Sequence, residues 1–206
     1  MPEPLPSRIA GREDIDVVAR TITLAFTDDP VWGPAMAADR TTVEQRLRLW
    51  RVLVAGAVRH PWSRVVDGGA ATSVWIPPDE SELDAEQEIE LRTTLVELLG
   101  EPGAAAFATL FERFEADHRH DVPHAYLSLL ATHPDRRGHG LGMSLLADDL
   151  RRLDELHLAA WLESTNPAND VRYRSVGFEP VGAFRTLDEQ RVITTMWRPA
   201  RRLATG

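Results

Sequence analysis

Glycine, arginine and histidine are concentrated in one short segment of the chain, ATHPDRRGHGLGMSLLADDL (131–150), whose second half is rich in leucine. A loop that runs into a helix presents unpaired backbone N–H groups and the positive end of the helix dipole. Glycines let a ligand approach such a loop without a Cβ in the way. The segment therefore predicts a phosphate or pyrophosphate site, with Arg137 and His139 adding positive charge.

The spacing of the glycines does not match two common nucleotide-binding motifs. A dinucleotide-binding G-x-G-x-x-G pattern would need glycine where Met143 stands, and a Walker A loop needs a lysine. The chain contains 23 basic residues, all of them arginine. The sequence therefore disfavours both a dinucleotide-binding loop and a Walker A loop. The pattern that remains is R-x-x-G-x-G over residues 137–142.

Hydrophobic spacing predicts alternating helices and strands around this loop. Thr41 and Glu44 predict a capping box for the second helix, and Gly100 and Pro102 interrupt an acidic helical pair at 79–121. The expected helices cover 15–26, 41–58, 141–153 and a short stretch that ends at Gly177. The expected strands cover 64–67, 70–76, 124–132, 158–164 and a final hairpin. The strand, helix and strand from 124 to 164 predict a right-handed parallel βαβ unit.

Composition narrows the class of protein. A length of 206 residues indicates roughly one domain, and the absence of cysteine excludes a thiol nucleophile and disulfides. A net charge of −9 disfavours nucleic acid as a partner and suits a cationic small substrate. No long apolar run or basic N-terminal signal is visible, so we expect a cytoplasmic protein with no membrane partner.

Three histidines, His118, His120 and His124, could suggest a metal site. No carboxylates accompany them at ligand spacing, so we expect no metal and interpret this stretch as a solvated helix end.

A second motif, NPANDVRYRSVGF (166–178), follows the glycine loop after one predicted strand. The two motifs together resemble the GNAT family of N-acetyltransferases, and the order of elements resembles that family from about residue 10 to 198. The stretches LAFTDDP, SVWIPPDES and WLESTNPAN look like the puromycin N-acetyltransferase-like subgroup. The resemblance implies one α/β domain over 1–206, with a helical insertion on the acceptor side at about 79–121. Its mixed, mostly antiparallel central sheet would splay at the cofactor site between the strands at 124–132 and 158–164, with helices on both faces.

The resemblance also implies a reaction, the direct transfer of an acetyl group from acetyl-CoA to a small-molecule amine in a ternary complex. Tyr173 would protonate the departing thiolate, since a phenol with a pKa of about 10 is protonated at neutral pH. Asn169 would contact the pantetheine arm. The strand residues that would pair with pantetheine are Leu130, Ala131 and Thr132, and the pyrophosphate would be held by Arg137, Gly138, His139, Gly140, Leu141, Gly142 and Met143.

Several assignments stay open at this stage. The proton of the amine could pass to Glu163, to His133 or to a water chain, and Glu163 could equally be an ordinary strand-end carboxylate. The candidate acceptor residues, which could equally be turn and core residues, are Asp28, Asp29, Trp32 and Trp75. Two alternatives to a small-molecule N-acetyltransferase stay open. One is a non-catalytic CoA or acyl-CoA sensor, and the other is an acetyltransferase for a protein N-terminus or an O-acceptor. The chain could be a monomer or a homodimer.

Overall fold

The structure is a computed structural model that describes residues 6–201. Seven strands form one sheet in the order β1-β2-β3-β4-β5-β7-β6. The strands are β1 (Ser7–Ile9), β2 (Arg64–Val66), β3 (Ala71–Ile76), β4 (His124–Thr132), β5 (Ala159–Ser164), β6 (Glu179–Arg185) and β7 (Val192–Arg198). The α-helices are α1 (Ile15–Phe26), α2 (Trp32–Ala35), α3 (Val43–Ala57), α4 (Ala85–Asp117), α5 (Leu141–Glu155) and α6 (Asp170–Ser175).

The sheet opens between its two parallel strands. β4 pairs with β5 over three residues, His124 to Tyr126. The antiparallel pairing of β3 with β4 continues to Thr132 and that of β5 with β7 continues to Ser164, so the two parallel strands separate beyond Tyr126. All other neighbouring strands are antiparallel. The predicted mixed, mostly antiparallel sheet that splays between these strands is therefore confirmed.

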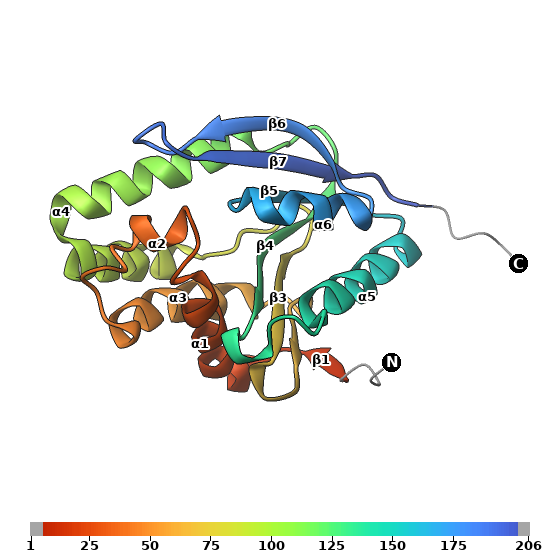
Figure 1. Cartoon of the computed structure of the whole chain (residues 1–206), viewed down its shortest axis with the longest axis horizontal. Helices are drawn as coiled ribbons and strands as arrows, with labels where there is room; N and C mark the ends of the chain where they lie inside the picture. The colour runs from red at the N-terminus through yellow and green to blue at the C-terminus, as the bar shows by residue number, and fades with distance from the viewer. Residues whose placement is uncertain (1–5, 202–206) are drawn as a thin grey trace, which may run out of the picture.

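Helices cover both faces of the sheet, as predicted. Figure 1 shows α1 to α4 to the left of β3 and β4 and α5 to their right. The left-hand core is built around Trp50, with α1 and α3 packed on each other and α4 packed on α3. The right-hand core is formed by one face of α5, including Leu146, Leu150 and Leu153, against the central strands. The hydrophobic periodicity of α3 and α5 thus follows from the burial of one face of each helix.

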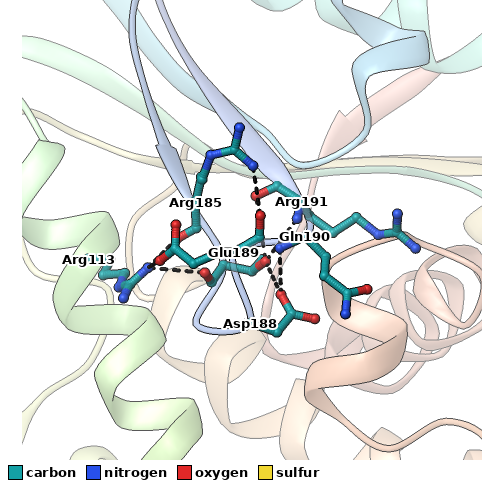
Figure 2. Close-up of polar contacts among 7 residues, drawn as sticks. Arg113, Arg185, Asp188, Glu189, Gln190 and Arg191 are labelled. Carbon is teal, nitrogen blue, oxygen red and sulfur yellow. Dashed lines mark hydrogen bonds and ion pairs between the residues drawn. The ribbon is translucent and has the colours of Figure 1, made fainter.

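The long helix α4 is held over the sheet by the β6–β7 hairpin. Gly100 interrupts the helix with φ 72° and ψ 168°, which divides it into the two helical stretches that the sequence predicts. Figure 2 shows Arg113, from the second stretch, donating to the carbonyl oxygens of Arg185 and Thr186 at 2.7 and 3.1 Å. The same guanidinium pairs with Glu189. Within residues 6–201 no helix, α4 included, is long and apolar enough to cross a membrane.

The predicted capping box is displaced by one residue. The N-cap of α3 is Thr42, whose hydroxyl accepts from the Gln45 N–H while the Gln45 side chain accepts from the Thr42 N–H. Thr41 is engaged elsewhere, since its hydroxyl lies 2.9 Å from the carbonyl oxygens of Met36 and Ala37. The prediction of Thr41 and Glu44 is therefore wrong, because adjacent threonines leave the choice of cap to the tertiary structure.

Two buried carboxylates of α5 fasten the helix to the sheet. Asp154 accepts two hydrogen bonds from the Arg198 guanidinium, at 2.8 and 2.6 Å. Asp149 accepts from the Ser73 hydroxyl at 2.6 Å and from the Trp75 indole N–H at 2.9 Å. Burial raises the pKa of Asp149 to about 6, although both hydrogen bonds oppose this shift.

Candidate active site

A cleft of about 610 Å³ opens where β4 and β5 separate. Its walls come from the end of β4, the loop that leads into α5 and the segment that leads into α6. The predicted donor-side residues that line it are Leu130, Ala131, Thr132, Arg137, Gly138, Gly140, Leu141, Gly142, Met143, Asn169 and Tyr173. Residues predicted from three separate segments of sequence thus lie around one cleft.

The loop before α5 adopts a conformation that glycine favours. Gly138 and Gly140 have φ values of 81° and 74°, and Gly140 is the N-cap of the helix. A Cβ on either glycine would meet nothing within 4 Å, so both border open space. A Cβ on Gly142 would lie 2.6 Å from the Thr132 hydroxyl oxygen. Glycine therefore allows the start of α5 to pack closely on β4 while its first N–H groups border the cleft.

The two cationic side chains of the loop lie differently. Arg137 lines the cleft and donates from Nη2 to the Ala25 carbonyl oxygen of α1 at 2.9 Å. His139 is exposed, and its Nδ1 lies 2.9 Å from the Arg137 carbonyl oxygen. His139 is not among the residues that line the cleft in the described structure.

A second cavity, of about 620 Å³, adjoins the cleft. One wall is aromatic, and in it the rings of Trp32 and Phe114 stack at 5.6 Å. The carboxylates that line this cavity are Asp29, Asp79, Glu80, Glu82, Glu88, Glu115 and Glu163. The residues that line both the cavity and the cleft are Phe26, Asp29, Leu130, Asn169 and Tyr173. The two hollows therefore meet at a short boundary that includes Tyr173.

Tyr173 is half-buried at this boundary, and its ring packs edge-on against Phe178 with centroids 6.2 Å apart. The pKa of Tyr173 is raised to about 12, mainly by burial and to a smaller extent by the nearby carboxylates of Asp29 and Asp170. The hydroxyl therefore keeps its proton at neutral pH and can donate a hydrogen bond to a group at the boundary.

Glu163 lies in the wall of the second cavity, and its side chain is only 2% exposed. Its carboxylate accepts from the Trp161 indole N–H and lies 3.6 Å from His118 Nδ1. His118 Nε2 is in turn 3.0 Å from His124 Nε2. The predicted solvated helix end is wrong for these two histidines, because His124 is buried and stacks on His118. Within residues 6–201 no group of histidine and acidic side chains is arranged to hold a metal ion.

The remaining predicted residues are distributed over several places. Trp32 lines the second cavity, and Asp28 lines the cleft instead. Asp29 lines both, but its Oδ1 accepts from the backbone N–H groups of Val31 and Trp32 and its Oδ2 accepts from the Thr165 hydroxyl at 2.9 Å. Trp75 lies in the core against α5, and His133 lies in the loop after β4; neither lines the cleft or the cavity.

Glu82, Tyr126 and Ser128 are among the residues of the cavity that were not predicted from the sequence. The Ser128 hydroxyl lies 3.1 Å from both carboxylate oxygens of Glu82. Tyr126 lies close to both Glu82 and Glu163, and its pKa is raised by burial and by these carboxylates. The pairing of β4 with β3 shifts register at Ser128, which breaks the two-residue alternation of the strand, so the sequence period gave no usable signal for this face. Glu82 is one acidic residue among 32 and carried none.

Residues 69–178 match the acetyltransferase (GNAT) family. Because this match spans more than half of the chain, the chain belongs to the GNAT family of acetyltransferases. Members of this family use acetyl-CoA as co-substrate, and acetyl-CoA is therefore the acetyl donor for this chain.

Similar solved structures support the same fold. A structure described as histone acetyltransferase HPA2 and related acetyltransferase, from Corynebacterium glutamicum, has a TM-score of 0.66 and 21% identity, over 98% of this chain and 100% of that chain. Arylalkylamine N-acetyltransferase 2 from Aedes aegypti has a TM-score of 0.66 and 15% identity, over 97% and 100%. Polyamine N-acetyltransferase from Drosophila melanogaster has a TM-score of 0.58 and 14% identity, over 95% and 99%. At these identities the likeness establishes the fold alone.

Proposed function

We propose that the chain is an N-acetyltransferase that transfers the acetyl group of acetyl-CoA directly to the nitrogen of a small-molecule amine. The observation that carries the proposal is the boundary between the two hollows, where Leu130, Asn169 and Tyr173 line both. A donor in the cleft and an acceptor in the cavity would meet at this boundary. Direct transfer in a ternary complex therefore needs no covalent enzyme intermediate.

The cleft has the features that acetyl-CoA requires. The open space beside Gly138 and Gly140 borders the start of α5, where backbone N–H groups suit a pyrophosphate. Beyond Tyr126, β4 is not paired with β5 in the described structure, so its edge at residues 130–132 is available to the amide groups of pantetheine. The Asn169 side-chain oxygen accepts from Arg172, which leaves its NH₂ group as a donor.

Acetyl-CoA supplies the acetyl group as a thioester, and Tyr173 is the residue placed to assist its departure. As the C–S bond breaks, negative charge develops on sulfur and a neutral phenol at the boundary donates a hydrogen bond to it. A pKa of about 12 keeps Tyr173 in its neutral donor form throughout the neutral range. The same residue therefore serves as the proton source for the leaving thiolate.

The cavity favours an acceptor that is cationic in solution and carries an apolar or aromatic body. Its carboxylates attract cations, and the aromatic wall around Trp32 and Phe114 offers stacking and cation–π contacts. Residues of the 79–121 region form much of this wall, which supports their role as an acceptor-side insertion. Two of the similar structures are named as arylalkylamine and polyamine acetyltransferases. The sequence likeness to the puromycin N-acetyltransferase-like subgroup adds amine-bearing antibiotics to the candidate acceptors.

The proposal is tested by incubating the protein with acetyl-CoA and a panel of amines. The panel contains arylalkylamines, polyamines and aminonucleoside antibiotics, with an N-terminal peptide and an alcohol as contrasting acceptors. We expect one free thiol for each amide formed with at least one small amine, and intersecting lines in two-substrate initial-rate plots. Parallel lines would contradict direct transfer. Tight binding of acetyl-CoA without thiol release in the presence of any acceptor would favour the sensor instead.

A further inference from the structure

We propose that Glu82 is the general base that removes the proton from the attacking amine, an inference that rests on the proposed function. The donor side of the site has an assigned proton source in Tyr173, whereas the acceptor side needs a group that takes a proton from nitrogen. Such a group must be open to the acceptor cavity, close to the boundary with the cleft and free to change its protonation state.

The position of Glu82 meets the first two requirements. Glu82 is partly buried in the segment between β3 and α4, and it lines the acceptor cavity. Its carboxylate is held by the Ser128 hydroxyl, 3.1 Å from both oxygens. Ser128 stands two residues before Leu130 in β4, at the point where the pairing with β3 shifts register. Leu130 lines both hollows, so the hydroxyl that holds the Glu82 carboxylate belongs to a residue two positions from the boundary.

The other carboxylates of the cavity are less suited to this role. Glu163 is almost completely covered, accepts from Trp161 and faces His118. Both carboxylate oxygens of Asp29 accept hydrogen bonds that fix local structure. The rest belong to exposed residues, namely Asp79, Glu80, Glu88 and Glu115. Among the described carboxylates that line the cavity, Glu82 alone combines partial burial with a single hydroxyl partner.

The chain holds the Glu82 backbone firmly against the C-terminal end of α3. Arg59 Nη2 donates to the carbonyl oxygens of Ser81 and Glu82, at 3.3 and 3.4 Å, and His60 Nε2 lies 3.2 Å from that of Ser81. A Cβ on Gly56 would lie 2.1 Å from the Glu82 carbonyl oxygen. Glycine at position 56 therefore permits the close approach that places Glu82 in the cavity wall.

The electrostatic surroundings of Glu82 support a role as base. Burial, together with the negative charge of Glu163, raises the pKa of Glu82 to about 7, while the hydrogen bond from Ser128 opposes the shift. Tyr126 faces it from β4, and Arg59, His60 and Asp84 lie around the backbone of its segment. A base that titrates near the working pH combines a substantial ionised fraction with useful basicity.

The reaction balances with these two residues. The amine nitrogen forms a bond to the carbonyl carbon of the thioester, and the C–S bond breaks with its electron pair on sulfur. The proton from nitrogen passes to the Glu82 carboxylate, and the hydroxyl proton of Tyr173 passes to sulfur. Glu82 then releases its proton to solvent and Tyr173 regains one, so the net products are the amide and the CoA thiol.

The test is the pH dependence of kcat with an acceptor whose amino group is bonded directly to an aromatic ring. Such an amine is already unprotonated around neutral pH, so its own titration adds no step to the profile. For the wild type we expect kcat to rise with pH through a single step with a midpoint near 7. In Glu82→Gln the step should disappear and kcat should fall by roughly 10²- to 10⁴-fold. The Kd of acetyl-CoA and the Tm should stay unchanged. Glu82→Asp, which keeps a carboxylate but shortens it, should retain the step at a reduced rate.

Two neighbouring variants shift the same step in opposite directions. Ser128→Ala removes the hydrogen bond that stabilises the carboxylate, so the midpoint should move to higher pH. Glu163→Gln removes a negative charge that disfavours ionisation of Glu82, so the midpoint should move to lower pH. Loss of the step in Glu163→Gln would overturn the proposal and assign the base to Glu163. A wild-type profile in Glu82→Gln would overturn it as well. Absence of thiol release by the wild type with every amine would instead overturn the proposed function, and the base with it.

Discussion

Two substitutions of Gly140, to aspartate and to asparagine, test whether the loop before α5 binds the pyrophosphate of acetyl-CoA. Gly140 is the left-handed N-cap of α5, and a Cβ there would meet nothing within 4 Å, so a small side chain enters open space without a clash. Asparagine and aspartate both tolerate this backbone region better than other residues, and they have nearly the same size. Gly140→Asp and Gly140→Asn therefore differ chiefly in one negative charge placed where we expect the pyrophosphate of acetyl-CoA.

The size of the difference follows from Coulomb's law. A carboxylate about 5 Å from one phosphate charge, at an effective dielectric constant of about 20, is repelled by about 3 kcal/mol. That energy corresponds to a Kd about 100-fold weaker for Gly140→Asp than for Gly140→Asn. The difference should shrink as salt is added, because part of the repulsion is screened.

Calorimetric titration of both variants with acetyl-CoA measures this difference, and thermal unfolding checks that both are folded. The two Tm values should agree, since the backbone strain is common to the pair. Equal acetyl-CoA affinities in two folded variants would refute the assignment of the pyrophosphate to this loop.

Two further predictions concern the buried carboxylates of α5, and both are measured by denaturant unfolding. The folded-state pKa of Asp149, about 6, lies above the usual unfolded value of about 3.9, so the folded state binds the extra proton and stability is lost as pH rises between these values. The unfolding free energy of the wild type minus that of Asp149→Asn should therefore fall by about 2 kcal/mol from pH 4 to pH 6, and a constant difference would contradict the buried-carboxylate interpretation. Arg198→Ala should cost about 3–5 kcal/mol because it leaves Asp154 without its guanidinium partner, and adding Asp154→Ala should recover part of this cost; strict additivity of the two changes would count against the pairing.

The sequence predicts the elements that repeat a simple pattern. The buried apolar run of β4 and the leucine face of α5 determine their own positions, and Gly100 divides α4 where the sequence places the break. β1 was not predicted, since three residues that pair with β2 at the edge of the sheet carry too little pattern. Local signals thus identify elements whose burial is periodic.

The donor side of the site was also accessible from the sequence, because one loop and one short helix carry most of it. The acceptor side depends on contacts between distant segments. Glu82 meets Ser128 across 46 positions of sequence, and Trp75 turns its indole toward Asp149 of α5 instead of the cavity. A strand has two faces, and only the packed structure shows which face of β3 borders the cavity.

The most direct test of the reaction is the turnover rate of Tyr173→Phe, measured with the acetyl-CoA affinity of the same variant. Phenylalanine keeps the ring that packs on Phe178 and removes the hydroxyl at the boundary between cleft and cavity. We predict that kcat falls by roughly 10²- to 10⁴-fold while the Kd of acetyl-CoA and the Tm change little. An unchanged kcat would contradict the assignment of the leaving-group proton to Tyr173, and a parallel loss of stability and activity would show that Tyr173 is a packing residue.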